Sequence, residues 1–212
     1  MAEEAKTKKF DGLLAKKLGM TQIYDESGKV FPVTVLEAGP CVVVKKLTKE
    51  KEGYVALQLG FDNRRKVNKP LAGIQKFLGR ETFFRYIKEI RSDESANFEP
   101  GEIISANIFT EGDRVDLIGD SIGKGFMGTV RRHHFGRGDM THGSKNHRNP
   151  GSSGAGTTPG RVVPGKRMAG RMGGERITQP SRIVKVDKEN NLIMVAGGVP
   201  GKEGNLIILR RT

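Results

Sequence analysis

The chain has few of the features that mark secreted or membrane-spanning proteins. It contains a single cysteine, Cys41, so no disulfide can form within it. No apolar run approaches the roughly 18 residues that a membrane helix requires, and residues 1–9 form a mixed-charge segment without an apolar centre. We therefore expect neither secretion nor membrane spanning and predict a cytoplasmic protein. Cys41 begins an apolar run, which predicts a buried core thiol.

Acidic residues are scarce relative to basic ones. The 212 residues include 37 Lys and Arg but 24 Asp and Glu, which gives a net charge of +13. Small soluble domains typically carry a net charge of about 2 to 8 in magnitude. The excess of positive charge is therefore better explained by a polyanionic partner than by a basic surface without a partner. Nucleic acid is the most common polyanionic partner.

Short runs rich in β-branched residues, separated by turn residues, predict a mainly β, barrel-like body. We expect two antiparallel strand pairs near the N-terminus, which suggest a barrel or a sandwich. The apolar runs at the two ends of the chain should pair in one body. A single short helix is expected at 70–79. The expected strands are 18–24 with 30–36, 41–47 with 54–61, and then 84–90, 103–109, 114–118, 182–186, 192–196 and 206–209.

Residues 121–182 differ from the rest of the chain. They hold 12 basic and 2 acidic residues, a net charge of +10, whereas the remaining 150 residues hold 25 and 22, a net charge of +3. The segment also contains 14 of the 29 glycines and all four histidines. Its apolar residues show no sustained period, so it should not build a core of its own. We predict a long basic, glycine-rich loop.

These observations divide the chain into three parts. Residues 1–10 are predicted to be an N-terminal extension, 11–120 with 183–212 a β-barrel body, and 121–182 a loop extension that penetrates RNA.

The stretch 123–130 matches the glycine-loop pattern of protein kinases, but the other kinase motifs do not follow it. The segment also lacks the spacing of a phosphate-binding P-loop and the context of a dinucleotide-binding fold. We therefore predict that the protein is not an enzyme and uses no cofactor. Glycines that expose backbone amides, together with Lys124, suit an RNA phosphate backbone equally well.

The four histidines have no nearby cysteine and no regular spacing, so we do not expect a metal site. Each lies near an arginine, which favours contacts with RNA phosphates and bases. The uncharged segment 149–158 is predicted to contain the loop tip, at Gly154, Ala155 and Gly156. The predicted RNA-binding residues are Lys124, Arg131, Arg132, His133, His134, Arg137, His142, Lys145, His147, Arg148, Arg161, Lys166, Arg167, Arg171 and Arg176.

Several ordered motifs resemble one known family. With similar segments near 191–192 and 197–201, they cover nearly the whole chain, and they resemble the bacterial L-three family of large-subunit ribosomal proteins. The motifs are GLLAKKLGMT (12–21), SIGKGFMGTV (121–130), THGS (141–144), PGR (159–161) and KRMAG (166–170).

The resemblance implies a β-barrel body and a loop that runs through 23S-type large-subunit rRNA toward the peptidyl-transferase region. It implies a role in early subunit assembly and contacts with neighbouring large-subunit proteins, namely proteins fourteen and nineteen. It implies neither catalysis nor membrane or DNA binding.

The chain departs from some relatives at three places. Ala155 stands where some relatives carry a glutamine that is methylated after synthesis, so we expect that modification to be absent. His133 stands where some carry tryptophan, so stacking there would use imidazole. Residues 1–10 extend beyond the usual family start.

Two other classes of function remain open from the residues alone. An architectural DNA-binding protein would have comparable charge and would bind duplex DNA as tightly as rRNA. An enzyme that uses the glycine loop and a histidine would bind a nucleotide specifically.

Overall fold

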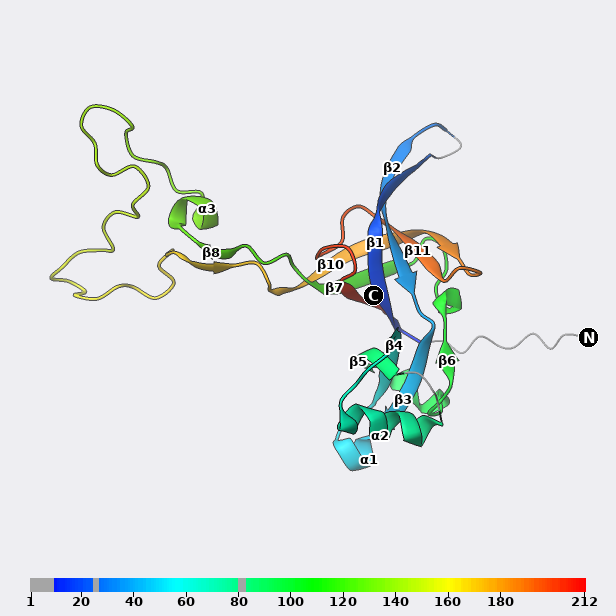
Figure 1. Ribbon diagram of the computed structural model, residues 1–212. Coiled ribbons are helices and arrows are strands. Elements are labelled where there is room, and N and C mark those ends of the chain that lie inside the picture. The colour runs from blue at the N-terminus through cyan, green and yellow to red at the C-terminus, as the bar shows by residue number, and fades with distance from the viewer. Residues whose placement is uncertain (1–9, 25–26, 80–82) are drawn as a thin grey trace, which may run out of the picture. The chain divides into compact units, whose positions relative to one another are not determined.

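The computed structural model describes residues 10–24, 27–79 and 83–212 (Figure 1). These residues form two compact units. We call the first, residues 10–120 with 176–212, the body, and the second, residues 121–175, the basic loop.

Six strands of the body form a closed barrel in the order β1-β12-β7-β10-β11-β2 (Figure 1). All neighbouring strands are antiparallel, and Leu13 of β1 lies opposite Leu209 of β12, so the two ends of the chain pair in one barrel as predicted. The prediction of a mainly β, barrel-like body is confirmed. The strands are β1 (Gly12–Tyr24), β2 (Val30–Ala38), β7 (Arg114–Asp120), β10 (Arg176–Asp187), β11 (Leu192–Ala196) and β12 (Leu206–Arg211).

The remaining body strands form a separate antiparallel sheet in the order β5-β4-β3-β6. The expectation that the first four strands share one barrel or sandwich is therefore wrong for β3 and β4, although they pair with each other as predicted. In the barrel, β1 pairs with β12 and β2 pairs with β11, both from the C-terminal part of the chain. These pairings occupy the edges of β1 and β2, so β3 cannot join the barrel. The strands are β3 (Cys41–Leu47), β4 (Ala56–Arg64), β5 (Phe83–Arg91) and β6 (Ile103–Ile104).

The predicted helix is α2 (Lys69–Leu78), which joins β4 to β5. A short helix that was not predicted, α1 (Lys49–Glu52), lies between β3 and β4, and the turn η1 (Asp93–Asn97) follows β5. The predicted strand 103–109 is wrong beyond Ile104. There the chain forms the 3-10 turn η2 (Ala106–Ile108), which buries Ala106 and Phe109 on the same side.

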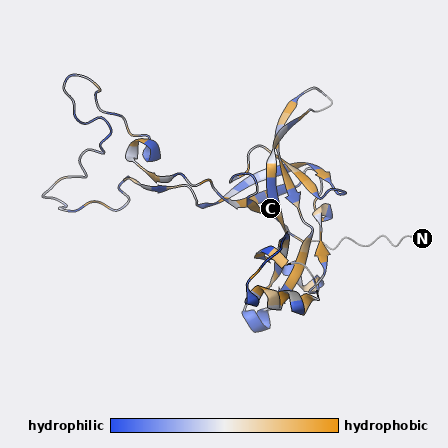
Figure 2. Ribbon diagram, viewed as in Figure 1, coloured by the Kyte–Doolittle hydropathy of each residue, from blue (hydrophilic) through white to orange (hydrophobic). Residues whose placement is uncertain are grey.

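One hydrophobic core joins the barrel and the sheet (Figure 2). It includes Leu13, Val43, Leu117 and Leu209, all fully buried, and Cys41, as predicted. A smaller cluster of Val42, Val44 and Phe84 lies on the sheet beneath α2, which packs Ile74 and Leu78 against it. Figure 2 shows hydrophobic and hydrophilic residues alternating along α2, as expected of a helix with one buried side.

Strand β10 begins earlier than the sequence suggested. It starts at Arg176 rather than 182, and residues 176–182 pair with β7 over its whole length. Composition assigns residues 176–182 to the loop. They belong instead to a barrel strand, and this includes Arg176 and Arg182. The basic loop proper, 121–175, keeps 10 basic and 2 acidic residues, a net charge of +8. No helix within the described parts of the chain has the length and apolar character needed to cross a membrane.

Candidate nucleic-acid interface

The basic loop begins and ends as a narrow two-stranded ribbon. Ser121 donates its backbone N–H to the carbonyl of Glu175 at 2.9 Å, and Lys124 donates to the carbonyl of Met172 at 2.8 Å. The strands β8 (Gly125–Met127) and β9 (Gly170–Met172) then pair antiparallel. The two ends of a 55-residue excursion are thus held together by backbone hydrogen bonds.

Glycine allows the two chains of this ribbon to approach closely. Gly173 has a φ of +70°, and a Cβ built there would lie 2.2 Å from the carbonyl oxygen of Ile122. Any other residue would be strained by the left-handed backbone and would collide with the opposite chain. The glycines of this segment therefore have a structural role as well as leaving backbone exposed.

A short helix, α3 (Thr129–His133), follows β8 and contains three of the predicted RNA-binding residues, Arg131, Arg132 and His133. Arg132 donates from Nη1 to the carbonyl oxygen of Met168 at 2.9 Å, and His133 Nε2 lies 3.0 Å from the same oxygen. A Cβ on Gly170 would lie 2.5 Å from Arg132 Nη1, so glycine leaves room for the guanidinium. Arg132 and His133 are thus half-buried and positioned, rather than free in solvent.

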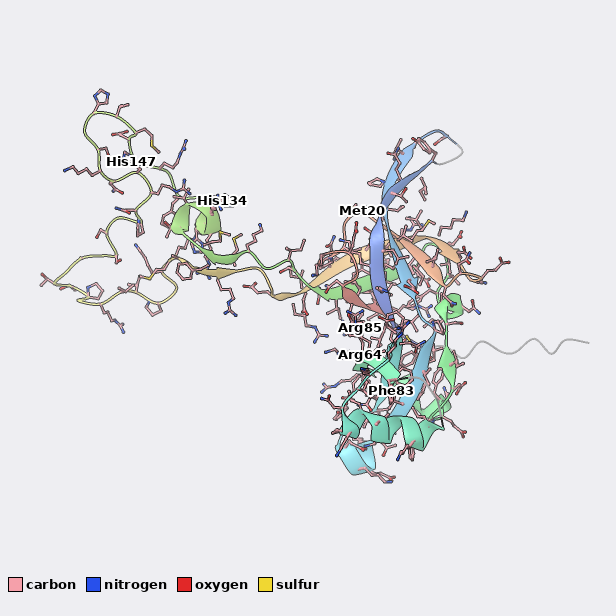
Figure 3. All side chains as sticks on the ribbon, in the orientation of Figure 1. Met20, Arg64, Phe83, Arg85, His134 and His147 are labelled. Atoms are coloured by element: carbon pink, nitrogen blue, oxygen red, sulfur yellow. The ribbon has the colours of Figure 1, made fainter. Side chains whose placement is uncertain are left out.

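Residues 134–169 form an open loop without a helix or strand (Figure 1). Local hydrogen bonds close part of it: His147 Nδ1 lies 2.8 Å from the carbonyl oxygen of Asp139, and Gly138 donates its N–H to the carbonyl of His147. Figure 3 labels His134 and His147 in this unit. His134 ends α3 in the left-handed conformation, with its side chain exposed.

Most of the predicted contact residues present their side chains to solvent. Arg132, His133 and His147 are half-buried, and Arg176 lies in barrel strand β10, opposite Asp120, rather than in the loop. Among the described residues, no ion pair joins a basic side chain of the loop to a carboxylate. The exposed members in the loop are Lys124, Arg131, His134, Arg137, His142, Lys145, Arg148, Arg161, Lys166, Arg167 and Arg171.

The predicted tip residues Gly154, Ala155 and Gly156 line a shallow hollow of about 210 Å³ together with Arg161. All four are exposed, and a Cβ on Gly154 or Gly156 would meet no atom within 4 Å. The hollow therefore has small, uncharged walls with a cation at its edge.

Sequence reasoning missed one exposed aromatic residue. Phe126 of β8 is 78% exposed and lies directly opposite Arg171 of β9. A ring and a guanidinium side by side are suited to stacking on bases. The sequence could have indicated this exposure, because a phenylalanine in a glycine-rich segment without a core has no hydrophobic surroundings in which to be buried.

The histidines do not gather around a common point. Within the described ranges, no group of three or more His, Cys, Asp and Glu side chains has the geometry of a metal site. What the unit offers instead is separated, exposed cations and exposed rings.

Comparisons with known proteins agree with this picture. The family model described as "Ribosomal protein L3" matches residues 90–191. The large ribosomal subunit protein uL3 of Nostoc punctiforme is 52% identical over 201 residues, which cover 92% of this chain and 94% of the relative. The uL3 of a Synechococcus strain is 51% identical over 202 residues, with 94% of each chain covered. That of a Prochlorococcus marinus strain is 49% identical over 202 residues, with coverages of 94% and 92%.

These matches extend over both the body and the basic loop, and they confirm the resemblance drawn from the motifs. The chain therefore belongs to the ribosomal protein L3 family and is a structural, non-enzymatic constituent of the large ribosomal subunit.

Proposed function

We propose that the basic loop is the main rRNA-binding element of this protein and that its ligand is 23S-type large-subunit rRNA. The observation that carries the proposal is the set of exposed basic side chains on the loop, none of them paired with a carboxylate among the described residues. A net charge of +8 on 55 residues without a hydrophobic core is stabilised when phosphates neutralise it.

The loop offers three kinds of contact. Exposed arginines such as Arg131 and Arg171 bind phosphates, because a guanidinium matches two phosphate oxygens at once. Phe126 and the exposed histidines stack on unpaired bases. Exposed backbone amides at the glycines donate to phosphate oxygens at close range.

The proposal extends to assembly and to the loop tip. A loop that lacks a core becomes ordered when RNA surrounds it, which suits a protein that joins the subunit early, while the RNA is still folding. The small residues Gly154, Ala155 and Gly156 permit close approach to RNA, and this supports an excursion toward the peptidyl-transferase region.

Contacts with neighbouring ribosomal proteins, expected to be proteins fourteen and nineteen, belong to the same proposal. The β1–β2 hairpin supports them, because Leu18, Met20, Tyr24 and Val30 are exposed on it (Figure 3 labels Met20). Tyr24 and Val30 lie directly opposite each other, and Met20 lies on the same face of the ribbon. An apolar face of this kind fits a protein neighbour better than phosphate.

The test measures the affinity of the full-length protein for a large-subunit rRNA transcript as a function of salt. Each phosphate contact contributes roughly 0.7 to 0.9 to the slope of log affinity against log salt. We expect a steep slope, which flattens by about one contact in each of Arg131→Ala and Arg171→Ala. Duplex DNA of equal length is the comparison ligand, and we expect weaker binding to it.

An affinity that does not change with salt would refute the proposal. Equal affinity for duplex DNA would favour a general architectural nucleic-acid binder. Saturable binding of a nucleotide at the glycine loop would instead favour the enzyme alternative.

A further inference from the structure

The body has its own concentration of positive charge, between the end of β4 and the middle of β5. Residues 64–88 include eight basic residues and one acidic residue, a net charge of +7. The body, residues 10–120 and 176–212, has 24 basic and 20 acidic residues, a net charge of +4, so the body outside residues 64–88 has a net charge of −3. The positive charge of the body is therefore local.

The acidic residues nearest this segment already have partners. Asp62 pairs with Arg85 at 3.4 Å, Glu52 pairs with Lys45 at 2.8 Å, and Glu89 accepts a hydrogen bond from the Tyr54 hydroxyl. Six basic side chains of residues 64–88 have no ion pair with any carboxylate of the described residues: Arg64, Arg65, Lys66, Lys69, Lys76 and Lys88. All six are exposed.

Helix α2 brings an aromatic ring into this basic segment. Phe77 is 77% exposed, although the same helix buries Leu78 partly against the sheet. One side of the helix carries Lys69, Gly73 and Lys76, which follow one another at intervals of four and three residues. Phe77, the next residue after Lys76, lies at the edge of the same side. A Cβ on Gly73 would meet nothing within 4 Å, so the surface beside the ring is open.

A groove runs between α2 and the sheet at this place. Its volume is about 380 Å³, and Pro70, Gly73, Ile74 and Phe77 of the helix line it together with Lys45 and Gln58 of the strands. The helix wall is thus an exposed ring beside apolar side chains. The strand wall is formed by Val44, Gln58 and Lys45, whose ammonium pairs with Glu52. A mostly apolar groove with an amide on one wall fits the flat face of a heterocycle.

The ends of β4 and β5 continue the basic surface. Arg64 lies opposite Phe83 in the strand register, and Phe84, the next residue, packs in the cluster beneath Ile74 and Leu78 of α2. Figure 3 shows Arg64, Phe83 and Arg85 close together at this part of the sheet. The arginines of the strand ends therefore extend the basic surface along β4, with Arg64 six residues beyond Gln58 of the groove.

We propose that the outer side of α2, with the adjoining ends of β4 and β5, is a second RNA-binding surface, which we call the α2 surface. An unpaired base stacks on Phe77 in the groove, the phosphates on either side contact Lys69 and Lys76, and a phosphate further along the RNA contacts Arg64. This inference rests on the proposed rRNA binding, because it identifies a second point of attachment for the same RNA. Exposed rings interleaved with unpaired cations are the usual composition of surfaces for single-stranded nucleic acid.

The test uses the full-length protein and a large-subunit rRNA transcript in which 4-thiouridine replaces uridine. Phe77→Ala should weaken binding about 5- to 30-fold, which corresponds to about 1 to 2 kcal/mol. Phe77→Tyr should restore it, because tyrosine keeps the ring. Irradiation should cross-link a nucleotide to the peptide that contains Phe77, as identified by mass spectrometry.

Matched controls separate the surface from general effects. Ile103→Ala removes an apolar side chain that is 58% exposed on β6 and should leave RNA affinity unchanged. Lys69→Ala combined with Lys76→Ala should flatten the salt slope by roughly two contacts, at about 0.7 to 0.9 each. Lys188→Ala, which lies between Asp187 and Glu189, should not flatten it. Circular dichroism of each variant should show an unchanged melting temperature, since the replaced side chains are exposed.

The outcomes are distinguishable. If Phe77→Ala binds as tightly as the original chain while Arg131→Ala and Arg171→Ala bind more weakly, the α2 surface is refuted and the loop proposal stands. If none of these variants weakens binding, both proposals fail. If Phe77→Ala lowers incorporation into large subunits without changing RNA affinity, the groove binds a protein neighbour, and the inference is overturned.

Discussion

Cys41 lies in the core, where its thiol donates to the carbonyl oxygen of Leu14 at 3.5 Å. Burial raises the pKa of this thiol to about 12, because a thiolate would lose its hydration. In the unfolded chain the thiol has its ordinary pKa of 9.0. A single residue thus makes the stability of the body depend on alkaline pH.

We predict that the thiol destabilises the folded body as pH rises. Because the pKa of the thiol is higher in the folded body than in the unfolded chain, the stability that the thiol contributes is fully present below pH 9. It is lost between pH 9 and about 12, where the thiol ionises in the unfolded chain but stays protonated in the folded body. Denaturant unfolding at pH 8 and pH 10.5 should show a larger loss for the original chain than for Cys41→Ala. Equal losses in the two proteins would contradict the prediction, because all other groups titrate alike in both.

Gly173 controls the ribbon of the basic loop. In Gly173→Ala the new Cβ would collide with the carbonyl of Ile122, and the left-handed backbone adds a strain of roughly 1–2 kcal/mol. We expect RNA affinity to fall about tenfold while the thermal unfolding midpoint of the body stays the same. Gly174→Ala is the control, since its φ is +71° but its Cβ would meet nothing within 4 Å. Similar affinities for the two variants would exclude the collision as the cause.

At the scale of elements, local patterns identified some segments and not others. The period of the apolar residues predicted α2 and the pairing of β1 with β2, whose connecting turn at 25–26 lies outside the described residues. The same reasoning failed at 103–109, where apolar residues with a strand-like spacing form a 3-10 turn. It also placed the start of β10 six residues late, since Arg176 and Gln179 read as part of a basic loop. Their strand conformation comes from pairing with β7.

We predict that the body folds without the basic loop. Ser121 and Glu175 are joined by a 2.9 Å hydrogen bond, so a short glycine linker can replace residues 122–174 without moving β7 or β10. The shortened protein should unfold cooperatively in a calorimeter and lose most of its affinity for rRNA. The affinity that remains should depend on Phe77. A product without a cooperative transition would show that the loop takes part in folding.

At the scale of the whole molecule, mutations in the body and mutations in the basic loop are expected to have different effects. Val43 is fully buried in the core shared by the barrel and the sheet, in β3 rather than in a barrel strand as expected. Ala155 is exposed in the predicted loop tip. A change at the first position acts on folding, and a change at the second acts on what the tip approaches.

We predict that Val43→Asp and Ala155→Trp impair the ribosome differently. An unpaired carboxylate in the core costs about 3–5 kcal/mol, so Val43→Asp should reduce assembly of large subunits. Ala155→Trp should leave assembly intact and alter translation rate or the binding of peptidyl-transferase ligands, because an indole cannot fit close to RNA. Subunit profiles and translation rates would be measured for both. An assembly defect of equal severity in the two variants, or no effect of Ala155→Trp at all, would show that the tip lies elsewhere.

The sequence by itself determined the family, the mainly β class and the basic loop, because motif order, strand periodicity and charge density are all local properties of the chain. Only the tertiary structure decided which strands close the barrel. The pairing of β1 with β12 and of β2 with β11 joins segments separated by most of the chain, and no local pattern encodes it. The same holds for the α2 surface. Residues 64–88 show their charge in the sequence, but whether Phe77 points into the core or into solvent depends on how the helix packs on the sheet.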